Sequence, residues 1–393
     1  MKRIRQAVVL AGGQGTRLQP LTLTTPKPLI PIHGKPFAEY LVELLKKNGI
    51  EEIIFLTGYL AEQFPATLGD GSRWSLTIRY NQTPVEDETG ERLCKAAHLL
   101  DDDFLLMYGD NYWPLNLSKL LAHHERMGTL ATVTAYDRPS TDSKNNMRIE
   151  DGMVRMYDKT KKAEGLNAVD IGFLILSKKI LEMIPEGNLN FEKTMYPALV
   201  AGRKLAGFLT CQPYWSLTSI ERFPAIERAL KSSRKVLFLD RDGTINKKAP
   251  LAEYVPNWSV FEFLPGALDA LEELAKRGYE FYIISNQPGI ARGMVKEEDL
   301  RDIHQRMQEA LKKRGVTISG IYYCPHGWDE GCDCRKPNPE MLYQAAREHD
   351  IDLTRAYFVG DDERDKEAGD AAGVQTILVP EGIGLAAALP QLP

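Results

Sequence analysis

Short apolar runs alternate with amphipathic stretches along the chain. In the first half, the pattern predicts strands at residues 6–10, 52–56, 76–80 and 104–108, with a helix at 118–127. In the second half, it predicts strands at 236–239, 281–285, 318–323, 357–359 and 376–379, and helices at 265–277 and 297–314. Strands that alternate with helices indicate βαβ units, so we expect parallel sheets packed against helices.

The alternation is interrupted once, near the middle of the chain. A helix predicted at 220–230 is followed by the polar stretch KSSRK, which contains no core residue. A chain of 393 residues is also long for one hydrophobic core, since domains average roughly 150 residues. We therefore predict two α/β domains, residues 1–230 and 235–393, joined by a linker at 231–234.

The composition is that of an ordinary globular protein, with 43% hydrophobic and 26% charged residues. A net charge of -5 argues against a nucleic-acid partner. The apolar runs are shorter than the roughly 18 residues that a membrane-spanning helix needs, and the start MKRIRQAVVLAGG does not resemble a signal peptide. We expect a cytoplasmic protein with neither nucleic acid nor membrane as a partner.

A glycine-rich loop, AGGQGTRL, follows the first predicted strand. The candidate nucleotide ligands in and after it are Gly12, Gly13, Gly15, Thr16, Arg17 and Lys27. The three glycines permit a tight turn that exposes backbone N–H groups to a triphosphate, and the lysine stands between two prolines that hold its segment in place. The loop is neither a Walker A loop nor a dinucleotide fingerprint, because the Lys-Ser/Thr pair and the last glycine are missing.

Residues 10–36 resemble the sugar-1-phosphate nucleotidyltransferases, whose signature LAGGxGTRLxPLTxxxPKPLxPVxGKP they follow almost without a break. Among these enzymes the chain is most similar to the mannose-1-phosphate and heptose-1-phosphate guanylyltransferases. The resemblance implies a Rossmann-like domain in which Arg17 and Lys27 contact the phosphates of the nucleoside triphosphate and the sugar 1-phosphate. It also implies that Asp110 binds magnesium, and that attack of the sugar phosphate on the α-phosphorus releases pyrophosphate.

The chain departs from this family at two places. ETGERLCKA replaces a GTGGAL-like segment, so Glu91 follows Gly90 and is expected to crowd the base site. Ser216 stands at or near the position of a second metal-binding aspartate, and a hydroxyl brings no charge to magnesium. Asp170 is a candidate substitute acid or sugar ligand. Weak activity, altered nucleotide choice and binding without catalysis all stay open for this domain.

In the second half, the ends of successive strands carry groups that bind phosphate or metal. These groups are Asp240 and Asp242 in KVLFLDRDGTIN, then Ser285 and Asn286, then Lys336 in CRKP, then Asp361 in GDDERD. The two acids of DxD point the same way from an extended chain. The order of motifs resembles the haloacid dehalogenase superfamily of phosphohydrolases, which carry DxD, Ser/Thr, Lys and GDxxxD.

This resemblance implies a covalent aspartyl-phosphate mechanism. Asp240 attacks phosphorus, while Asp242 protonates the leaving oxygen and later deprotonates the hydrolytic water. Lys336 and Ser285 hold the phosphoryl oxygens. The candidate magnesium ligands are Asp240, Asp242, Asp361 and Asp362, with Asp365 as the alternative to Asp362.

The segment CPHGWDEGCDCRK gathers metal-binding side chains before the lysine motif. Its candidate ligands are Cys324, His326, Cys332 and Cys334. Three thiolates and an imidazole form a closed zinc site by ligand count, and five cysteines in the whole chain fit a reducing compartment better than a disulfide framework. Cys94 and Cys211 are isolated and are expected to be structural. A zinc ion would stiffen the backbone that presents Arg335 and Lys336.

The zinc loop, with DRDGTIN and SNQPGIARG, resembles the zinc-containing phosphatases that act on heptose 1,7-bisphosphate and histidinol phosphate. No insertion between the motifs is large enough for a cap domain, so we expect a capless phosphatase domain with an open site. Loops 247–263 and 287–295 and the zinc loop would set its specificity. The candidate substrate ligands are Thr244, Asn286, Arg292 and Arg335, and the two arginines would meet a second phosphate.

The two resemblances fit one sequence of reactions, because removing the 7-phosphate of heptose 1,7-bisphosphate yields a sugar 1-phosphate. We expect an α/β protein with two Rossmann-like domains, acting on a sugar phosphate and a nucleoside triphosphate, GTP foremost, with Mg2+ and Zn2+. It would serve nucleotide-activated heptose synthesis for lipopolysaccharide or capsule. The alternatives are a phosphatase whose first domain only binds sugar nucleotide or oligomerises, and a pairing with another sugar-phosphate phosphatase. A homo-oligomer stays open.

Overall fold

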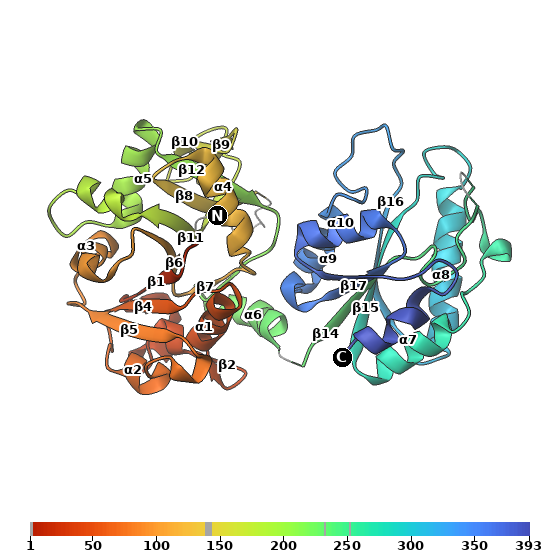
Figure 1. Cartoon of the computed structure of the whole chain (residues 1–393), viewed down its shortest axis with the longest axis horizontal. Helices are drawn as coiled ribbons and strands as arrows, with labels where there is room; N and C mark the ends of the chain where they lie inside the picture. The colour runs from red at the N-terminus through yellow and green to blue at the C-terminus, as the bar shows by residue number, and fades with distance from the viewer. Residues whose placement is uncertain (1–2, 138–143, 232, 251–252) are drawn as a thin grey trace. The chain divides into compact units, whose positions relative to one another are not determined.

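The computed structural model describes residues 3–137, 144–231, 233–250 and 253–393. The chain divides into two compact units, Met1–Leu230 and Lys231–Pro393 (Figure 1). Ser232 of the predicted linker and residues 251–252 of the predicted specificity loop lie outside the described residues. Within the described ranges, no helix is both long and apolar enough to cross a membrane.

One large mixed sheet forms the centre of the N-terminal unit, and nine strands belong to it in the described part of the chain. In spatial order they are β5 (Thr77–Gln82), β4 (Glu52–Thr57), β1 (Gln6–Ala11), β6 (Asp103–Tyr108), β11 (Val169–Ser177), β8 (Ala131–Tyr136), β12 (Leu205–Thr210), β10 (Met153–Tyr157) and β9 (Met147–Glu150). The first four pair in parallel, and β11 runs antiparallel to β6. The predicted βαβ pattern therefore holds for one half of the sheet only.

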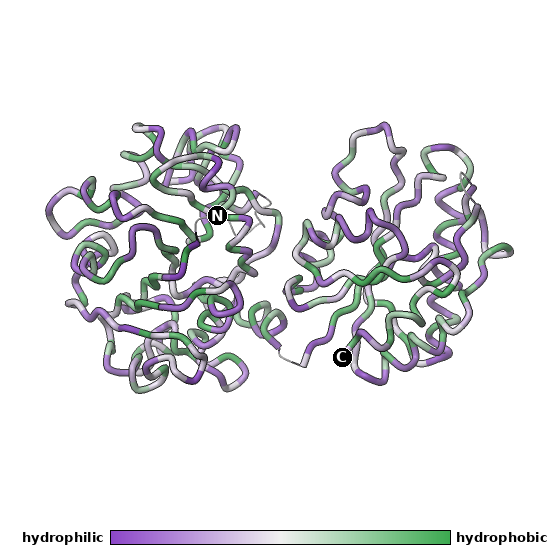
Figure 2. The backbone as a smooth tube through the Cα atoms, viewed as in Figure 1, coloured by the Kyte–Doolittle hydropathy of each residue, from purple (hydrophilic) through white to green (hydrophobic). Residues whose placement is uncertain are grey.

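Alternation along the strands divides the core of this unit between the two faces of the sheet. Val9 and Phe55 belong to one hydrophobic cluster, while Val8 and Ile54 belong to the other. The helices of the unit are α1 (Phe37–Lys47), α2 (Gln63–Leu68), α3 (Thr89–Lys95), α4 (Leu117–Met127), α5 (Phe191–Ala201) and α6 (Phe223–Leu230). Figure 2 shows the hydrophobic stretches along the central strands in green.

Two small antiparallel pairs accompany the large sheet in the described residues. One joins β2 (Pro31–Ile32) to β3 (Lys35–Pro36), and the other joins β7 (Asn111–Tyr112) to β13 (Trp215–Ser216). The second pair brings Ser216 opposite Asn111, directly after the end of β6. It therefore positions two segments that are distant in sequence beside Asp110.

The C-terminal unit is built on a parallel sheet, with five strands in its described residues. Their order is β16 (Ile318–Cys324), β15 (Tyr279–Asn286), β14 (Lys235–Leu239), β17 (Tyr357–Gly360) and β18 (Gln375–Leu378). The helices are α7 (Ala267–Lys276), α8 (Glu297–Lys312), α9 (Glu340–His349) and α10 (Glu363–Ala372). In Figure 1, α7 and α8 lie on one side of this sheet and α9 and α10 on the other. The predicted α/β fold class is confirmed.

The strand order of this unit explains where its polar groups meet. Since all five strands are parallel, their carboxyl ends share one edge of the sheet. Asp240 follows β14, Asn286 ends β15, Cys324 ends β16 and Asp361 follows β17. Helices on both faces bury the strands, and their loops surround this edge.

Candidate active sites and a metal-binding loop

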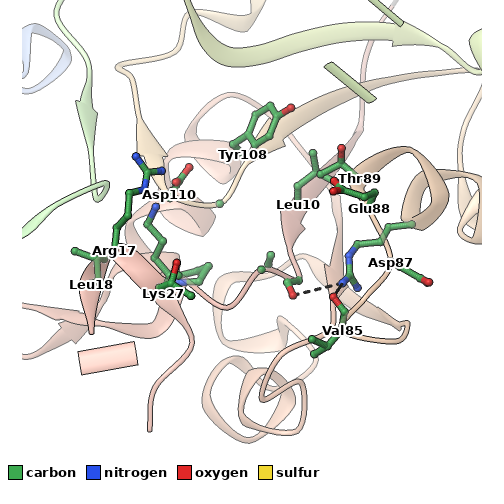
Figure 3. A pocket seen from close by; sticks show the side chains of 18 of the residues that line it. Leu10, Arg17, Leu18, Lys27, Val85, Asp87, Glu88, Thr89, Tyr108 and Asp110 are labelled. Atoms are coloured by element: carbon green, nitrogen blue, oxygen red, sulfur yellow. Dashed lines mark hydrogen bonds and ion pairs between the residues drawn. The ribbon is translucent and has the colours of Figure 1, made fainter. Parts of the chain in front are cut away.

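A cavity of about 420 Å³ in the N-terminal unit gathers the predicted nucleotide ligands. Its lining includes Gly12, Gly13, Gly15, Thr16, Arg17, Lys27 and Asp110. Gly15 adopts a left-handed conformation with a φ of 63°, which turns the loop after β1. In Figure 3, Arg17, Lys27 and Asp110 stand on one side of the cavity, and Asp87, Glu88 and Thr89 stand opposite. The Lys27 ammonium pairs with the Asp110 carboxylate.

The expected crowding of this cavity by Glu91 is not found. Among the described residues, Glu91 is not part of the lining, and its carboxylate pairs with Lys95 at 3.2 Å. Gly90 instead packs against the carbonyl of Leu189, to which its N–H donates at 2.9 Å. From α3, Thr89 and Arg92 line the cavity instead.

Arg92 connects the segments that surround the cavity. Its side chain is buried, and Nη1 donates to the carbonyl of Thr57 at 2.8 Å. Nη2 donates to the carbonyls of Pro84 and Val85 at 2.9 and 3.1 Å, and to that of Gly12 at 3.4 Å. One guanidinium therefore holds the end of β4, the glycine loop and the loop after β5. Arg92 is not among the site residues predicted from the sequence, because a charged residue between Glu91 and Leu93 gives no sign that its acceptors are backbone carbonyls.

A second cavity of about 410 Å³ adjoins Asp110 and contains the residues at which the chain departs from the expected pattern. Asp110, Asp170 and Ser216 line it together. Ser216 is buried, with 4% of its surface exposed. The Asp170 carboxylate accepts a hydrogen bond from the Tyr196 hydroxyl at 2.9 Å, and burial, with Glu192 nearby, raises its pKa to about 7.

In the C-terminal unit, a small cavity of about 80 Å³ forms where the predicted phosphatase motifs meet. Its lining includes Asp240, Asp242, Ser285, Asn286, Lys336, Asp361, Asp362 and Asp365. Lys336 lies at the centre, with Nζ 2.7 Å from Asp240 Oδ1 and 2.5 Å from Asp365 Oδ1. Burial acts to lower the pKa of Lys336, but these two carboxylates outweigh it and raise the pKa. The ammonium therefore stays charged.

Asp240 is buried beside this lysine. Burial raises the pKa of Asp240 to about 7, even though Lys336 acts in the opposite direction. Asn286 fixes the lysine backbone, since its side chain accepts from the N–H of Lys336 at 3.0 Å and donates to the carbonyl of Lys336 at 3.1 Å. The end of β15 and the lysine motif are thus joined directly.

Carboxylate oxygens of Asp240, Asp361 and Asp365 lie within 4.8 Å of one another. Asp361 Oδ1 is buried and, among the described residues, has no hydrogen-bond partner. Gly243 leaves room for the Asp361 carboxylate, because a Cβ at this position would overlap with it. A set of clustered acids with an unpaired buried oxygen fits a hard divalent cation such as magnesium.

The structure does not place Asp362 in this group of acids. Asp362 is the N-cap of α10: its carboxylate accepts from the Arg364 N–H at 3.0 Å and pairs with the Arg364 guanidinium at 2.7 Å. Asp365 completes the cap by accepting from the N–H of Asp362 at 3.1 Å. Between the two alternatives, the structure therefore favours Asp365 as a candidate metal ligand, because a carboxylate oxygen of Asp365 lies close to those of Asp240 and Asp361.

Asp242 also lies outside the group of three acids, although it lines the same cavity. Its carboxylate accepts hydrogen bonds from Arg241, from Asn246 Nδ2 at 2.8 Å and from Gln287 Nε2 at 2.7 Å. Burial alone would raise the pKa of Asp242, but the Arg241 charge and these hydrogen bonds hold it below its ordinary value. Asp242 is therefore a fixed carboxylate beside Asp240 and not a member of the clustered acids.

A groove of about 380 Å³ continues from this cavity past Asp242. Basic side chains line it, namely Lys248, Arg292, Arg335 and Arg364, together with Tyr254. Arg292 donates to the Tyr254 hydroxyl at 2.6 Å. Thr244, a predicted substrate ligand, lines neither the groove nor the small cavity: it is fully buried, and its carbonyl accepts from the Leu385 N–H at 2.9 Å. Four basic side chains therefore line the groove, together with the acids Asp242 and Glu253.

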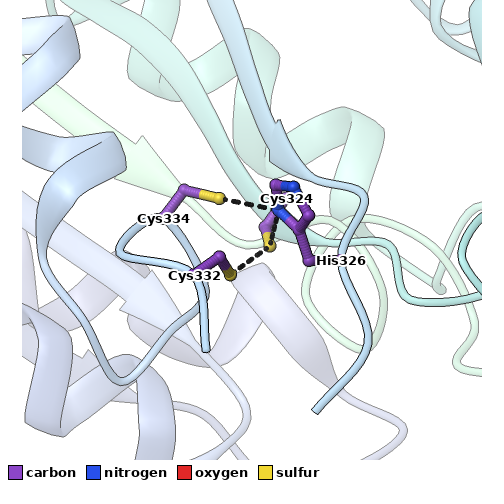
Figure 4. Close-up of side chains that lie close together, drawn as sticks. All are labelled: Cys324, His326, Cys332 and Cys334. Carbon is purple, nitrogen blue, oxygen red and sulfur yellow. Dashed lines mark hydrogen bonds between the residues drawn. The ribbon is translucent and has the colours of Figure 1, made fainter. Parts of the chain in front are cut away.

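The predicted zinc ligands converge at the end of β16 (Figure 4). Cys324 Sγ lies 3.5 Å from Cys332 Sγ and 3.6 Å from His326 Nδ1, and His326 Nδ1 lies 3.3 Å from Cys334 Sγ. Tetrahedral ligands at zinc bond lengths would be separated by roughly 3.3–3.8 Å. The three thiols and the imidazole therefore fit a zinc ion.

Comparison with known proteins agrees with both halves of this description. The profile of the nucleotidyl transferase family matches residues 6–217, and that of the HAD-hydrolase-like family matches residues 333–393. The chain is 43% identical over 155 residues to the D-glycero-beta-D-manno-heptose-1,7-bisphosphate 7-phosphatase of Pseudomonas putida, a match that covers 38% of the chain and 85% of the relative. The phosphatase of the same name from Escherichia coli is 40% identical over 161 residues, covering 39% and 83%.

The crystal structure of HddC from Yersinia pseudotuberculosis shares the fold of the nucleotidyltransferase portion. It covers 56% of this chain and 97% of its own, with a TM-score of 0.50 and 24% identity. The chain is an enzyme that combines a nucleotidyltransferase domain with a phosphatase domain. It belongs to the nucleotidyl transferase family through residues 6–217 and also to the family of the D-glycero-beta-D-manno-heptose-1,7-bisphosphate 7-phosphatases.

Proposed function

We propose that the chain is a bifunctional enzyme of nucleotide-activated heptose synthesis. Its C-terminal unit removes the 7-phosphate of D-glycero-D-manno-heptose 1,7-bisphosphate, and its N-terminal unit transfers a nucleotidyl group to the resulting heptose 1-phosphate. The observation that carries the proposal is the contact of Lys336 with both Asp240 and Asp365, which assembles the motifs of a phosphotransferase site. The relatives that share this unit are phosphatases of the same bisphosphate.

In this proposal, Asp240 attacks the phosphorus of the 7-phosphate and becomes an aspartyl phosphate. Lys336 and Ser285 contact the phosphoryl oxygens, and the buried ammonium offsets the charge that repels an anionic nucleophile. A magnesium ion held by Asp240, Asp361 and Asp365 would supply further charge neutralisation when bound. Asp242, ionised in the free enzyme, would take up a proton from solvent as the anionic phosphate binds, and would give this proton to the leaving sugar oxygen. The carboxylate restored in this way then takes a proton from the water that hydrolyses the intermediate.

The 1-phosphate of the substrate would lie in the basic groove beside Asp242. Arg292 and Arg335 are its proposed ligands, and Lys248 and Arg364 add positive charge along the same groove. Bisphosphates are thereby favoured over monophosphates. The zinc proposed for the loop of Cys324 to Cys334 would fix the backbone that leads to Arg335. Thiolate ligands of this kind persist in a reducing compartment, so we place the enzyme in the cytoplasm.

For the N-terminal unit we propose transfer from a nucleoside triphosphate, with GTP as the expected substrate. The glycine loop with Arg17 and Lys27 would hold the phosphates, and Asp110 would hold magnesium. The sugar 1-phosphate would occupy the adjoining cavity that contains Asp170. The product of the phosphatase is the type of molecule that this reaction consumes, which supports joining the two units in one chain.

A second candidate function is phosphatase activity alone, with an N-terminal unit that binds sugar nucleotide without transferring it. One observation favours it: Ser216 is buried beside the cavity of Asp110, where a second acid would assist the metal. A serine hydroxyl supplies no charge there.

The test supplies the full-length enzyme with heptose 1,7-bisphosphate, magnesium and each nucleoside triphosphate in turn, and follows phosphate and pyrophosphate separately. Release of both supports the bifunctional enzyme, with pyrophosphate appearing fastest from GTP. Release of phosphate without pyrophosphate under every nucleotide supports the second candidate. If neither phosphate nor pyrophosphate is released, both candidate functions are refuted. Asp240→Asn should abolish phosphate release while leaving pyrophosphate release from preformed heptose 1-phosphate unchanged.

A further inference from the structure

Between the two acids of the DxD motif lies an arginine that no step of the proposed reaction uses. The side chain of Arg241 is buried, with only 1% of it exposed. Nη2 donates to Asp242 Oδ1 at 2.9 Å and to Oδ2 at 2.7 Å, and Nε lies 3.2 Å from Oδ1. The guanidinium therefore holds the plane of the Asp242 carboxylate.

The other end of this guanidinium contacts His304, which lies on α8. Arg241 Nη1 is 3.3 Å from His304 Nε2, and both side chains are buried. A guanidinium has donors but no acceptor, so Nε2 must present its lone pair and the imidazole proton must sit on Nδ1. The same environment favours the neutral ring, because burial, with Arg241 nearby, lowers the pKa of His304 to about 3.

We propose that His304 is a positioning residue of the phosphatase, which orients Asp242 through Arg241. This inference rests on the proposed function only in assigning proton transfer to Asp242. Without the imidazole, Nη1 would lose its acceptor in a buried place, where an unmade hydrogen bond is costly. The guanidinium would then turn towards another acceptor and take the Asp242 carboxylate with it.

Gln287 connects the Asp242 carboxylate to both Arg241 and Ser285. Gln287 Oε1 accepts from Arg241 Nη2 at 3.2 Å, and Gln287 Nε2 donates both to Asp242 Oδ2 at 2.7 Å and to Ser285 Oγ at 2.8 Å. A rotation of Arg241 would therefore disturb the acid and the phosphate-binding serine through one amide. His304, on a helix at the face of the sheet, is the outermost member of this chain of contacts.

The effect of such a rotation depends on the leaving group. A sugar alkoxide needs a proton from Asp242 as it departs, whereas p-nitrophenolate leaves readily without one. Misplacing Asp242 should therefore slow cleavage of the sugar phosphate, and should leave the first release of p-nitrophenolate nearly unchanged. A general loss of folded enzyme would lower both rates by the same factor.

The experiment compares the full-length wild type with His304→Leu, which lacks an acceptor, and His304→Gln, whose amide oxygen can replace Nε2. Turnover of heptose 1,7-bisphosphate should fall about 10-fold or more in His304→Leu, while the pre-steady-state release of p-nitrophenolate from p-nitrophenyl phosphate changes less than about 2-fold. His304→Gln should recover most of the turnover. The control is His349→Leu, which removes a histidine of α9 that is hydrogen-bonded to the Tyr322 hydroxyl, and it should change neither rate.

Equal losses with the two substrates would overturn the proposal, as would an unchanged turnover in His304→Leu. A failure of His304→Gln to recover turnover, when its thermal unfolding matches wild type, would also overturn it. If wild type hydrolyses p-nitrophenyl phosphate but not the heptose bisphosphate, the proposed substrate is wrong. The same comparison is then made with fructose 1,6-bisphosphate, whose leaving group is also an alkoxide.

Discussion

The guanidinium of Arg92 lies directly against Gly58, at the end of β4. A Cβ at Gly58 would stand 2.5 Å from Nη1 and 2.6 Å from Nη2 of Arg92, closer than any real contact of this kind. Gly58 does not have the positive φ at which alanine would be strained, so the restriction comes from the arginine alone. The buried Arg92 guanidinium thus occupies the space that a side chain at position 58 would fill, beside the proposed nucleotide site.

A double-mutant cycle tests this fit. Gly58→Ala should destabilise the N-terminal unit by about 1–3 kcal/mol, because it overpacks a buried site. In the Arg92→Ala background, the same change should cost less than about 0.5 kcal/mol, since the clashing atoms are gone. Denaturant unfolding of the four proteins measures the coupling. Additive costs would show that the clash is relieved in another way.

The two candidate acids at the start of α10 can be separated by isosteric substitutions. Asp365→Asn should lower phosphate release by roughly 100-fold or more, because it removes a charge from the group formed with Asp240 and Asp361. Asp362→Asn should stay within about 3-fold of wild type, since asparagine is an equally good N-cap. Phosphate release is measured over a range of magnesium concentrations, and the reverse ranking would place Asp362 at the metal.

Loss of a thiol should empty the zinc loop. For Cys332→Ser we expect the zinc content to fall from about one ion per chain towards zero, with a lower unfolding temperature of the C-terminal unit. Elemental analysis and thermal unfolding measure the two effects. Cys94→Ser, in the other unit, is the control and should keep its zinc. Full zinc content in Cys332→Ser would show that this sulfur is not a ligand.

Asp170 should make the stability of the N-terminal unit depend on pH. The folded pKa of about 7 exceeds the unfolded value of roughly 3.9, so the folded state binds the proton more tightly. This contribution to stability is complete below about pH 4 and is lost as the pH rises through 7. The unfolding temperature of Asp170→Asn should therefore exceed that of wild type at pH 8, and the difference should be much smaller at pH 4.

Thermal unfolding at the two pH values measures this difference. Asp151→Asn serves as the control, because its side chain is 93% exposed and should show no such trend. A gain for Asp170→Asn of the same size at both pH values would contradict the titration of this carboxyl group.

Ser216→Asp should strengthen nucleotidyl transfer by placing a carboxylate near Asp110. We expect pyrophosphate release to increase several-fold at low magnesium, with Ser216→Asn unchanged because it adds size without charge. If both variants lose activity equally, the pocket of Ser216 does not accept a larger side chain and the acid is supplied elsewhere.

The residues that sequence reasoning placed well are those whose chemistry is local. Asp240 directly follows β14 and Asp361 directly follows β17, and the ends of parallel strands meet at one edge of the sheet. Likewise, the predicted zinc ligands lie within 11 residues of one another, so their spacing alone brings them together. The parallel half of the N-terminal sheet was predicted for the same reason.

What escaped prediction depends on contacts between distant segments. The sequence does not distinguish Asp362 from Asp365, since both belong to the capping box of α10 and only the fold brings Asp365 close to Asp240 and Asp361. Arg92 resembles a surface charge in the sequence, because most of its acceptors are backbone carbonyls and any residue type can supply these. Thr244 follows the DxD motif but turns into the core, where its neighbour is Leu385 from the end of the chain. In the N-terminal sheet, β11 pairs antiparallel with β6 and β8, which are distant in sequence, so this part of the sheet was not predicted.

The closeness of the sulfur atoms in the zinc loop makes the loop sensitive to oxidation. Cys324 and Cys332 are 3.5 Å apart, so a shift of about 1.5 Å would bring them to disulfide distance once the metal is lost. Lys336 lies two residues beyond Cys334, so oxidation of this loop would pull on the backbone that carries the central ammonium. Bound zinc would thus act as a protecting group, and oxidative damage would reach the phosphatase through its scaffold before any reacting atom is touched.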